Sequence, residues 1–347
     1  MNRISVEDLN HILEHTSDLW ESFRGKSILL TGGTGFFGKW FLESFLYINE
    51  KLNLNATITT ITRNPDAFLS DYPFYQHHSD TIIFLKGDIL NFDFNLINKS
   101  KFNYIIHAAT SASDDLNKNN PLLMMDTITV GTRRVLDFSC SQPIESFLFI
   151  SSGAVYGSQP FNVSHIREND SFNININNTK SAYAEGKRIA ELYCSSYYEL
   201  KKLPVKIARC FAFVGPFLPL DAHFAIGNII NNVLKNEDII IKSDGTAVRS
   251  YLYASDLMIW LLKILICGDS NSPYNVGSDE FISINDLAIK IKKISNSNVS
   301  IKILGSKLSK ENVDIYCPNI SKARTLNAYV NISLEESINK TLQFYNY

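Results

Sequence analysis

This chain of 347 residues has no closely spaced pair of cysteines and almost no net charge. Its cysteines are odd in number, widely separated and without a CxxC pair, which predicts reduced thiols and neither disulfides nor a metal site; they are Cys140, Cys194, Cys210, Cys267 and Cys317. Lys and Arg (33) nearly balance Asp and Glu (35), so the formal charge is only -2. That balance leaves no broad electrostatic footprint for nucleic acid or an anionic membrane, and we expect neither as a partner.

Long apolar runs are also missing. The longest, Leu257 to Cys267, is interrupted by Lys263 and is far shorter than the roughly 20 residues that span a bilayer. The opening MNRISVEDLNHILEH is acidic and polar where a secretory signal would be basic and then apolar, so we expect a cytoplasmic protein. What the chain does have is 45% hydrophobic and 12% aromatic residues, enough for a substantial core.

Short β-branched apolar runs alternate with longer helical patterns through the first 210 residues. This alternation predicts an α/β fold, a doubly wound Rossmann-type parallel sheet whose ligand crevice lies at the carboxyl ends of the strands. The expected strands are Ser27–Thr31, Thr57–Thr62, Ile82–Lys86, Tyr104–His107, Phe147–Ser151 and Val205–Arg209.

Beyond Arg209 the pattern becomes irregular and predicts a smaller, discontinuous C-terminal substrate-binding domain, or cap. We expect residues 1–210 and 248–272 to form the dinucleotide-binding domain, with 1–24 as a helical extension that packs on it or joins copies of the chain. Residues 211–247 and 273–347 would form the cap, with helices near Phe224–Lys235, Ser283–Ile294 and Leu334–Tyr345.

The strongest local motif is Thr31-Gly32-Gly33-Thr34-Gly35-Phe36-Phe37-Gly38, directly after the first strand and opening a helix. Gly32, Gly35 and Gly38 have the spacing that permits a tight turn, close backbone approach to a pyrophosphate and close helix packing. We therefore expect these three glycines, together with Phe36 and Phe37, to bind a dinucleotide. An ordinary tight turn is the alternative for the glycines alone.

Residues at the ends of the next strands bear on the choice of cofactor. Arg63 stands where an NAD enzyme commonly carries an acid for the ribose diol, and its guanidinium suits a 2′-phosphate. This favours NADPH, with NAD as the alternative and a solvated arginine as the other interpretation. Asp88 and Ile89 follow the third strand, with Asp88 facing the adenine amino group, and the small Ala108 and Ala109 let the backbone approach the cofactor. For His107 a buried structural role is favoured over catalysis.

Tyr183 and Lys187 are four residues apart in a helical stretch, so they share one face. A free tyrosine has a pKa near 10, and a nearby cation lowers it, which would bring Tyr183 into the acid/base range. YxxxK alone is a common surface pattern. Upstream, however, Ser151 and Ser152 present hydroxyls at the end of the fifth strand.

These motifs, in this order, resemble the extended short-chain dehydrogenase/reductase family of nucleotide-sugar enzymes. The resemblance covers nearly the whole chain, including Arg209-Cys210-Phe211, the segment Arg249 to Asp256 and Tyr274-Asn275-Val276-Gly277. It implies that Tyr183 exchanges a proton with a sugar hydroxyl or carbonyl. It further implies that Ser152 binds the same oxygen, that Lys187 binds the nicotinamide ribose and tunes Tyr183, and that Arg249 meets the nucleotide diphosphate. A homodimer is expected.

Departures from the family pattern narrow the reaction. The 4,6-dehydratases of the family carry Thr-Asp-Glu at the positions where this chain has Ser152-Gly153-Ala154. Gly153 and Ala154 cannot transfer protons. The same reasoning argues against decarboxylases of the Ser-Glu type. Ala212 stands where relatives often carry an asparagine near the sugar diphosphate. Two reactions remain: NADPH-dependent reduction of a nucleotide 4-keto-6-deoxyhexose for surface polysaccharide precursors, which Arg63 favours, and 4-epimerisation of a UDP-hexose with retained NAD. A noncatalytic cofactor-binding sensor is a remote third hypothesis.

Overall fold

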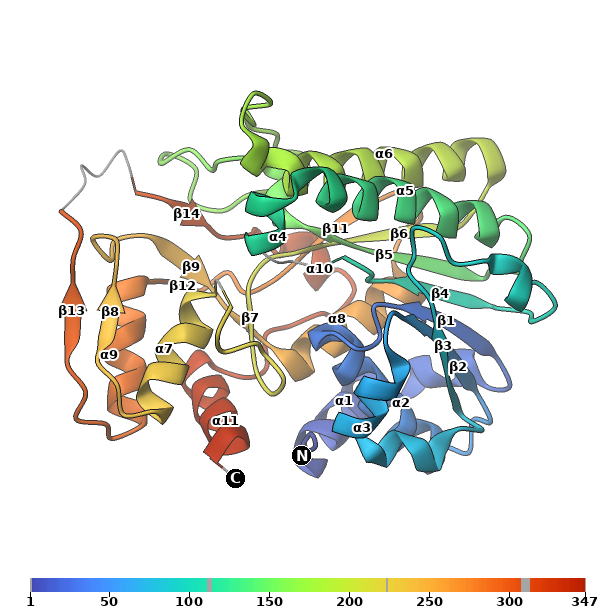
Figure 1. Cartoon of the computed structure of the whole chain (residues 1–347), viewed down its shortest axis with the longest axis horizontal. Coiled ribbons are helices and arrows are strands. Elements are labelled where there is room, and N and C mark those ends of the chain that lie inside the picture. The colour runs from blue at the N-terminus through green and yellow to red at the C-terminus, as the bar shows by residue number, and fades with distance from the viewer. Residues whose placement is uncertain (1, 111–113, 223, 307–312, 347) are drawn as a thin grey trace.

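The computed structural model describes residues 2–110, 114–222, 224–306 and 313–346. Its centre is a parallel sheet of seven strands that carries the expected doubly wound order (Figure 1). The chain reverses its direction of travel across the sheet between two neighbouring strands, β1 and β4, and such a switch point opens a crevice at the carboxyl ends. In order across the sheet the strands are β11 (Pro273–Val276), β6 (Val205–Cys210), β5 (Ser146–Ser152), β4 (Tyr104–His107), β1 (Ser27–Thr31), β2 (Thr57–Thr62) and β3 (Ile82–Lys86).

Alternation along the strands builds one core on each face of this sheet. In β1, Ile28 and Leu30 join one core and Leu29 joins the other, because successive side chains of a strand point to opposite faces. Helices α5 (Pro121–Ser139) and α6 (Ala182–Lys201) cover one face, with α4 (Asp114–Asn119) at the end of α5. The other face is covered by α1 (Val6–Trp20), α2 (Phe36–Lys51), α3 (Pro65–Asp71) and α8 (Ala254–Cys267).

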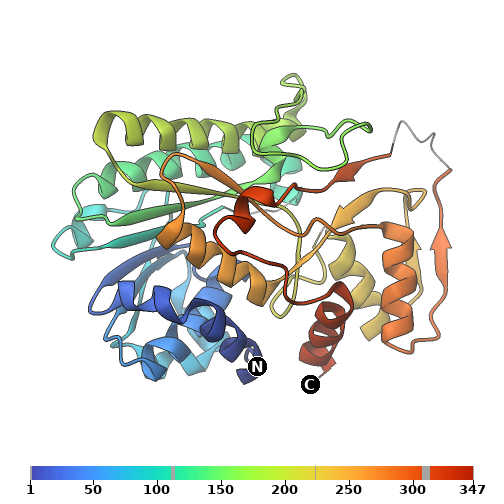
Figure 2. The same ribbon diagram turned by 180° about the vertical axis from the view of Figure 1, so that it is seen from behind.

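The small lobe lies at the carboxyl edge of the sheet (Figures 1 and 2). Strand β9 (Val248–Ser250) pairs with both β12 (Phe281–Ser283) and β14 (Ile315–Tyr316). The lobe also contains the pair β8 (Ile239–Ile241) and β13 (Ile301–Ile303), and the helices α7 (Ala225–Leu234), α9 (Ile284–Ile294) and α11 (Leu334–Asn346). Two short strands, β7 (Phe213–Val214) and β10 (Leu252–Tyr253), join it to the main sheet, and α10 (Ser321–Arg324) lies against β11.

The expected strands and helices are confirmed, but two expected domain boundaries are wrong. Residues 273–276, assigned to the cap, form the edge strand of the main sheet, because β11 continues the parallel ladder beside β6. Residues 248–250, assigned to the dinucleotide-binding domain, pair with strands of the small lobe, β12 and β14. The rest of the division into two domains stays a prediction.

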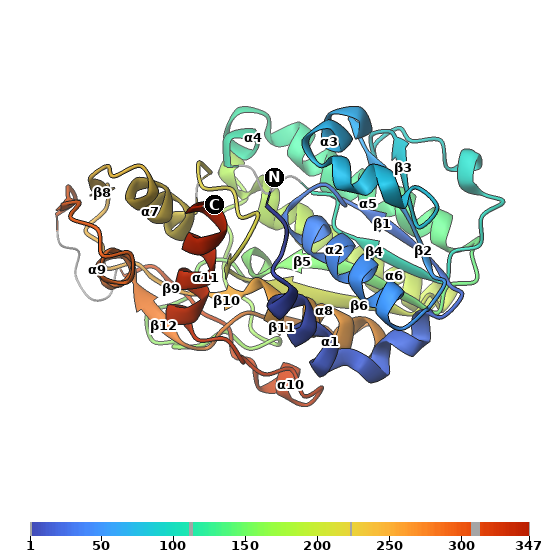
Figure 3. The same ribbon diagram turned by 90° about the horizontal axis from the view of Figure 1, so that it is seen from below.

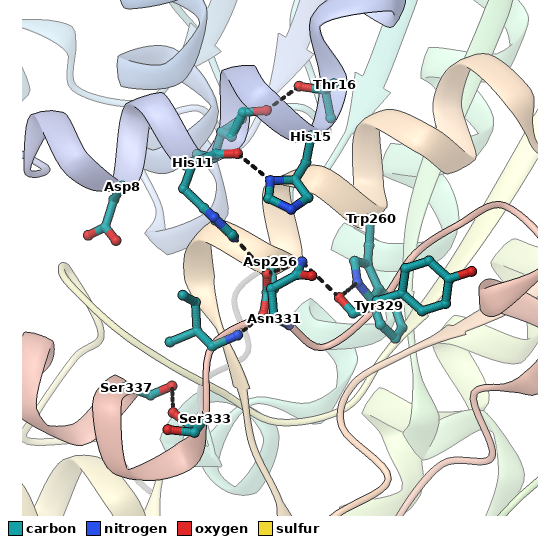
Figure 4. Close-up of polar contacts among 12 residues, drawn as sticks. Asp8, His11, His15, Thr16, Asp256, Trp260, Tyr329, Asn331, Ser333 and Ser337 are labelled. Atoms are coloured by element: carbon teal, nitrogen blue, oxygen red, sulfur yellow. Dashed lines mark hydrogen bonds and ion pairs between the residues drawn. The ribbon is translucent and has the colours of Figure 1, made fainter.

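The N-terminal extension forms α1, which packs on α8 and α2 (Figure 3). One of its polar side chains contacts a residue of α8 that in turn binds the segment leading into α11 (Figure 4). His11 Nε2 lies 3.1 Å from the carboxylate of Asp256, which is fully buried on α8 and accepts a hydrogen bond from the backbone of Asn331. None of the described helices is both long and apolar enough to cross a membrane.

Candidate active site

Three glycines shape the loop between β1 and α2. Gly32 has φ +76°, and a Cβ there would come within 2.6 Å of the Ala108 carbonyl. A Cβ on Gly38 would lie 2.3 Å from the Gly33 backbone, so α2 can begin this close to the loop only with glycine at position 38. Sequence reasoning missed Gly33, whose absent side chain makes room for Thr60 of β2.

Gly35 differs from these, because a Cβ there would meet only Gly32 O, at 3.5 Å. It caps the N-terminus of α2 and is exposed, so the first N–H groups of the helix face open space. A helix N-terminus with room for close approach suits a phosphate anion. Phe36 and Phe37 stand at this end of α2 with half-buried side chains, and the Phe37 ring meets Phe213 edge-on. The loop therefore fits a dinucleotide, bound by backbone groups.

The end of β2 carries no acid. Arg63 is exposed and makes no hydrogen bond or ion pair within the described part of the chain. Thr62 is buried, and its hydroxyl lies 3.4 Å from the hydroxyl of Thr34 in the glycine loop. The guanidinium of Arg63 is thus a cation that lies beside the glycine loop and has no partner among the described residues.

The other predicted cofactor residues line the same edge. Asp88 is partly exposed, and one of its carboxylate oxygens accepts a hydrogen bond from Leu90 N. The Ile89 side chain is buried against Gly131 of α5, so only its backbone remains to meet a ligand. Ala108 and Ala109 are half-buried, and their N–H groups donate to the carbonyl and hydroxyl of Thr31.

His107 occupies a fully packed position, as predicted. Its Nδ1 lies 2.6 Å from the Thr31 hydroxyl and its Nε2 lies 3.0 Å from the Thr132 hydroxyl. Burial lowers its pKa to about 3, so the ring is neutral at physiological pH. These contacts fit a structural histidine that joins β1 and β4 to α5.

Ser152, Tyr183 and Lys187 come together at the carboxyl end of β5. Ser152 ends that strand and is buried, and the first turns of α6 carry Tyr183 and Lys187. The Ser152 hydroxyl acts on the Tyr183 phenol in the direction that lowers its pKa. Lys187 donates to Ile150 O at 2.7 Å and to the Thr110 hydroxyl at 3.1 Å, so Thr110 is a further polar residue that the sequence motifs did not indicate.

Lys187 is not the group that lowers the pKa of Tyr183, contrary to the expectation from the helical spacing. Its ammonium lies 5.9 Å from the centre of the Tyr183 ring and is committed to Ile150 and Thr110. Burial raises the pKa of Tyr183 to about 12, and the Ser152 hydroxyl opposes that rise. Burial also lowers the pKa of Lys187 to about 8. The effect of burial on the pKa of Tyr183 thus outweighs any effect of having Lys187 on the same helical face.

Arg249 lies on β9, in the sheet of the small lobe. Its guanidinium forms an ion pair with Asp314 at 2.5 Å and also donates to the carbonyl oxygens of Val248 and Asp314. Burial raises the pKa of Tyr316, its register partner on β14, and the charge of Arg249 opposes that rise. Among the described residues, no three His, Cys, Asp or Glu side chains gather as a metal site would need.

Comparison with known proteins agrees with this geometry. Residues 28–277 match the family model described as the NAD dependent epimerase/dehydratase family. UDP-glucuronic acid decarboxylase 1 of Danio rerio is 27% identical over 92% of this chain and 73% of its own length. The dTDP-D-glucose 4,6-dehydratase of Dictyostelium discoideum is 30% identical over 78% of this chain and 62% of its own length.

Solved structures share the fold. The UDP-N-acetylglucosamine 4-epimerase of Methanobrevibacter ruminantium superposes with a TM-score of 0.80, at 22% identity over 92% of this chain and 98% of its own. An epimerase of Methanothermobacter thermautotrophicus has the same TM-score, at 21% identity over 96% of both chains. Because the family model spans both the glycine loop and the Ser152, Tyr183 and Lys187 cluster, this chain belongs to the NAD dependent epimerase/dehydratase family of nucleotide-sugar modifying enzymes.

Proposed function

We propose that the protein carries out NAD(P)-dependent oxidoreduction at C4 of a nucleotide-activated sugar, and that its reaction is the NADPH-dependent reduction of a nucleotide 4-keto-6-deoxyhexose. The product would serve as a precursor of surface polysaccharide. The observation that carries the proposal is the cluster of Ser152, Tyr183 and Lys187 at the carboxyl end of the sheet, beside a Gly153-Ala154 pair that holds no acid.

Each of the three residues has a separate task in this reaction. Tyr183 gives its proton to the oxygen on C4 during reduction, and Ser152 holds the same oxygen by a hydrogen bond. Lys187, fixed by Ile150 and Thr110, binds the nicotinamide ribose. The glycine loop at Gly32, Gly35 and Gly38 receives the pyrophosphate, with Asp88 and the 108–109 backbone along the remaining cofactor. A reduced nicotinamide, when bound, supplies the hydride.

The absence of acids at positions 153 and 154 argues against elimination and decarboxylation here. Several relatives are named as decarboxylases or dehydratases. Those chemistries were expected from the sequence to need an acid directly after the serine or threonine, and this chain has glycine and alanine there. Oxidoreduction at C4 needs only the proton relay that the cluster supplies.

The cofactor preference and the substrate contacts are also proposals. Arg63, exposed and unpaired among the described residues, supports NADPH, because no acid follows β2 to bind a ribose diol. Arg249 would meet the substrate diphosphate from the small lobe, exchanging its pairing with Asp314 for phosphate oxygens. Exposed apolar side chains on α5 and α6, among them Leu122, Leu192 and Leu200, support the expected homodimer. The cytoplasmic location stays a prediction.

Epimerisation of a UDP-hexose at C4 is the second candidate, favoured by the family description as NAD dependent. It requires the same three residues and no additional acid. The two reactions differ in whether the cofactor is consumed.

One experiment separates these reactions. Purified protein is incubated with NADPH and a set of nucleotide 4-keto-6-deoxyhexoses, and separately with UDP-hexoses, while cofactor and sugar are followed by absorbance and NMR. NADPH consumed in equal amount with the product supports the reductase. Isomerisation without net consumption selects the epimerase. Cofactor binding with no conversion of either set would support the noncatalytic sensor and overturn the proposal.

A further inference from the structure

The turn that follows β3 is built around Asp88, the candidate residue for the adenine amino group. Phe92 N donates to Asp88 O at 2.7 Å and Asn91 N donates to the same oxygen at 3.0 Å, so residues 88–92 form one closed turn. One carboxylate oxygen of Asp88 accepts a hydrogen bond from Leu90 N at 2.9 Å. The other carboxylate oxygen has no hydrogen bond or ion pair within the described ranges, and the side chain is partly exposed. Asp88 can therefore accept a further hydrogen bond from a ligand.

Arg134 of α5 supplies the donors for two carbonyl oxygens of this turn. Its Nε lies 3.2 Å from Ile89 O, and its Nη2 lies 2.6 Å from Phe92 O. Ile89 and Phe92 are buried, and buried backbone carbonyl groups need hydrogen-bond donors. The planar guanidinium reaches both oxygens from one side chain, which the single ammonium of a lysine cannot do in the same geometry. Arg134 thus bridges two points of the turn that carries Asp88.

Helix α5 and strand β2 hold the same turn at two further places. A Cβ on Gly131 would lie 2.9 Å from Ile89 Cγ2, so glycine at this position allows α5 to approach the turn closely. Arg134 follows Gly131 by three residues and therefore lies on the same face of the helix. Where the turn begins, Gly87 N donates to Thr62 O at 2.9 Å and joins it to the end of β2. The turn is thus bound to both elements.

We propose that Arg134 is a positioning residue for the cofactor, which holds residues 88–92 against α5 and thereby directs the free carboxylate oxygen of Asp88 at the exocyclic amino group of adenine. This inference rests on the proposed function, because it takes Asp88 as the residue that meets the adenine. Both described contacts of the guanidinium are with backbone carbonyl oxygens, so Arg134 acts on the cofactor through the turn. The arrangement selects a base that carries an amino group at this position, because a carboxylate only accepts hydrogen bonds.

The first test compares the binding of NADPH with that of its hypoxanthine analogue, in which an oxygen replaces the amino group, by fluorescence titration. We expect the parent to bind NADPH about tenfold more tightly. In Arg134→Met the Kd for NADPH should rise about tenfold and the Kd for the analogue only about threefold, because the carboxylate is no longer directed at the amino group.

Arg133→Met is the matched control for this comparison. Arg133 is the neighbouring residue on α5, is exposed and forms its ion pair with Asp137 at 3.9 Å. Its variant should bind both cofactors as the parent does. A loss of general stability would raise both Kd values alike, whereas the proposal requires their ratio to change. An unchanged ratio in Arg134→Met would overturn the proposal.

Two other variants test the route from Arg134 to the base. Arg134→Lys keeps the charge and loses the planar fork, so it should bind like Arg134→Met, and parent-like binding would contradict the positioning role. Asp88→Asn places an amide nitrogen where the free carboxylate oxygen was, so the ratio should fall to about one or below. Adding Arg134→Met to Asp88→Asn should lower the ratio no further, because both changes act on one contact. A further fall would count against that shared contact.

Hydrogen exchange tests the structural step in the absence of any cofactor. The amides of Asn91 and Phe92 should exchange at least about fivefold faster in Arg134→Met than in the parent or in Arg133→Met, because their turn has lost its bond to α5. Equal exchange in all three proteins would show that Arg134 does not hold the turn, and would overturn the inference.

These measurements need no turnover, so their failure and the failure of the proposed function can be told apart. An unchanged affinity ratio in an enzyme that reduces a keto sugar would reject the role of Arg134 and leave the proposed reaction intact. A ratio that falls in Arg134→Met, in a protein that converts no nucleotide sugar, would support the inference while rejecting the reaction. Equal affinities of the parent for the two cofactors would overturn the inference, because Asp88 would then not recognise the base.

Discussion

At the scale of single residues, the Tyr183 hydroxyl can be removed with little change in packing. Tyr183→Phe keeps the ring on α6 and loses the group that moves the proton, so we expect turnover to fall about 100- to 10,000-fold with fold and cofactor affinity retained. Ser152→Ala should lose less, since Ser152 orients the oxygen without being the main donor. Steady-state kinetics and cofactor titration measure both. A Tyr183→Phe enzyme within a few-fold of the parent would exclude Tyr183 as the acid.

We expect Lys187 to make cofactor affinity depend on pH. Burial lowers its pKa to about 8, so the ammonium is present below that value and is lost as pH rises through it. If the ammonium binds the ribose, the Kd for cofactor should rise between pH 7 and pH 9.5. Lys187→Met should bind weakly across this range, without the pH dependence. Fluorescence titration measures the Kd, and identical profiles for the two proteins would remove Lys187 from the cofactor site.

Arg63 bears on cofactor choice because only NADPH carries the additional phosphate. Arg63→Met should weaken NADPH binding about tenfold through loss of a charge-assisted contact, while NADH binding changes less than about twofold. Arg133→Met, another exposed arginine, is the matched control. An unchanged ratio of the two affinities would make Arg63 a solvated surface residue, and the preference for a reductase would lose its main support.

At the scale of elements, α6 connects the site to the core. Residues 183, 187 and 191 follow each other at four-residue spacing, and the last is Glu191. Its carboxylate accepts from Arg209 Nη2 at 2.7 Å and from the Ser151 hydroxyl at 2.5 Å, and both partners of the ion pair are largely buried. The helix that carries the proposed acid is therefore tied to β5 and β6.

Breaking this ion pair should destabilise the protein strongly. Glu191→Gln leaves the Arg209 guanidinium buried without a counter-charge, and we expect the free energy of unfolding to fall by about 3 to 5 kcal/mol. Glu185→Gln on the same helix, which loses a more exposed pair with Arg188, should cost less than about 1 kcal/mol. Urea unfolding measures both. Equal losses for the two variants would show that burial does not set the strength of this pair.

Sequence patterns predicted the features that depend on neighbouring residues. Strands and helices were predicted from the local periodicity of apolar residues. The glycine loop and the spacing of Tyr183 and Lys187 each involve only a few consecutive residues. The proximity of Tyr316 to Gly153 could not be predicted in this way, because the two residues are far apart in the sequence and the contact requires the small lobe to be placed. The pKa of Tyr183 was misjudged for the same reason, since burial by distant segments outweighs one nearby cation.

At the scale of the whole molecule, α1 joins the two ends of the chain. Asp8 accepts a hydrogen bond from the Tyr253 hydroxyl and forms an ion pair with Lys340 of α11. One turn further along α1, His11 contacts Asp256 (Figure 4). The extension thus contacts both α8, which covers the main sheet, and α11 of the small lobe.

Asp256 is the central hydrogen-bond acceptor where α1, α8 and residues 331–332 meet, which we call the junction. It is fully buried, and its carboxylate accepts from Asn331 N at 2.8 Å, from Ile332 N at 2.9 Å and from Asn331 Nδ2 at 2.9 Å. An amide at position 256 has one accepting oxygen, which can keep the two backbone donors, but Asn331 Nδ2 then loses its acceptor and the buried carboxylate charge that faces His11 is removed. We expect Asp256→Asn to lower the free energy of unfolding by about 2 to 4 kcal/mol.

The same change should loosen the small lobe before the main sheet unfolds. Hydrogen exchange of Asp256→Asn should quicken first at residues 329–337 and in α1, which contact Asp256 directly or through His11, while β4 and β5 keep the protection of the parent. Asp126→Asn, on an exposed position of α5, is the control and should change stability by less than about 0.5 kcal/mol. If exchange instead quickened equally in β4, β5 and residues 329–337, the junction would not be a separate unit, and the loss of Asp256 would act only through global unfolding.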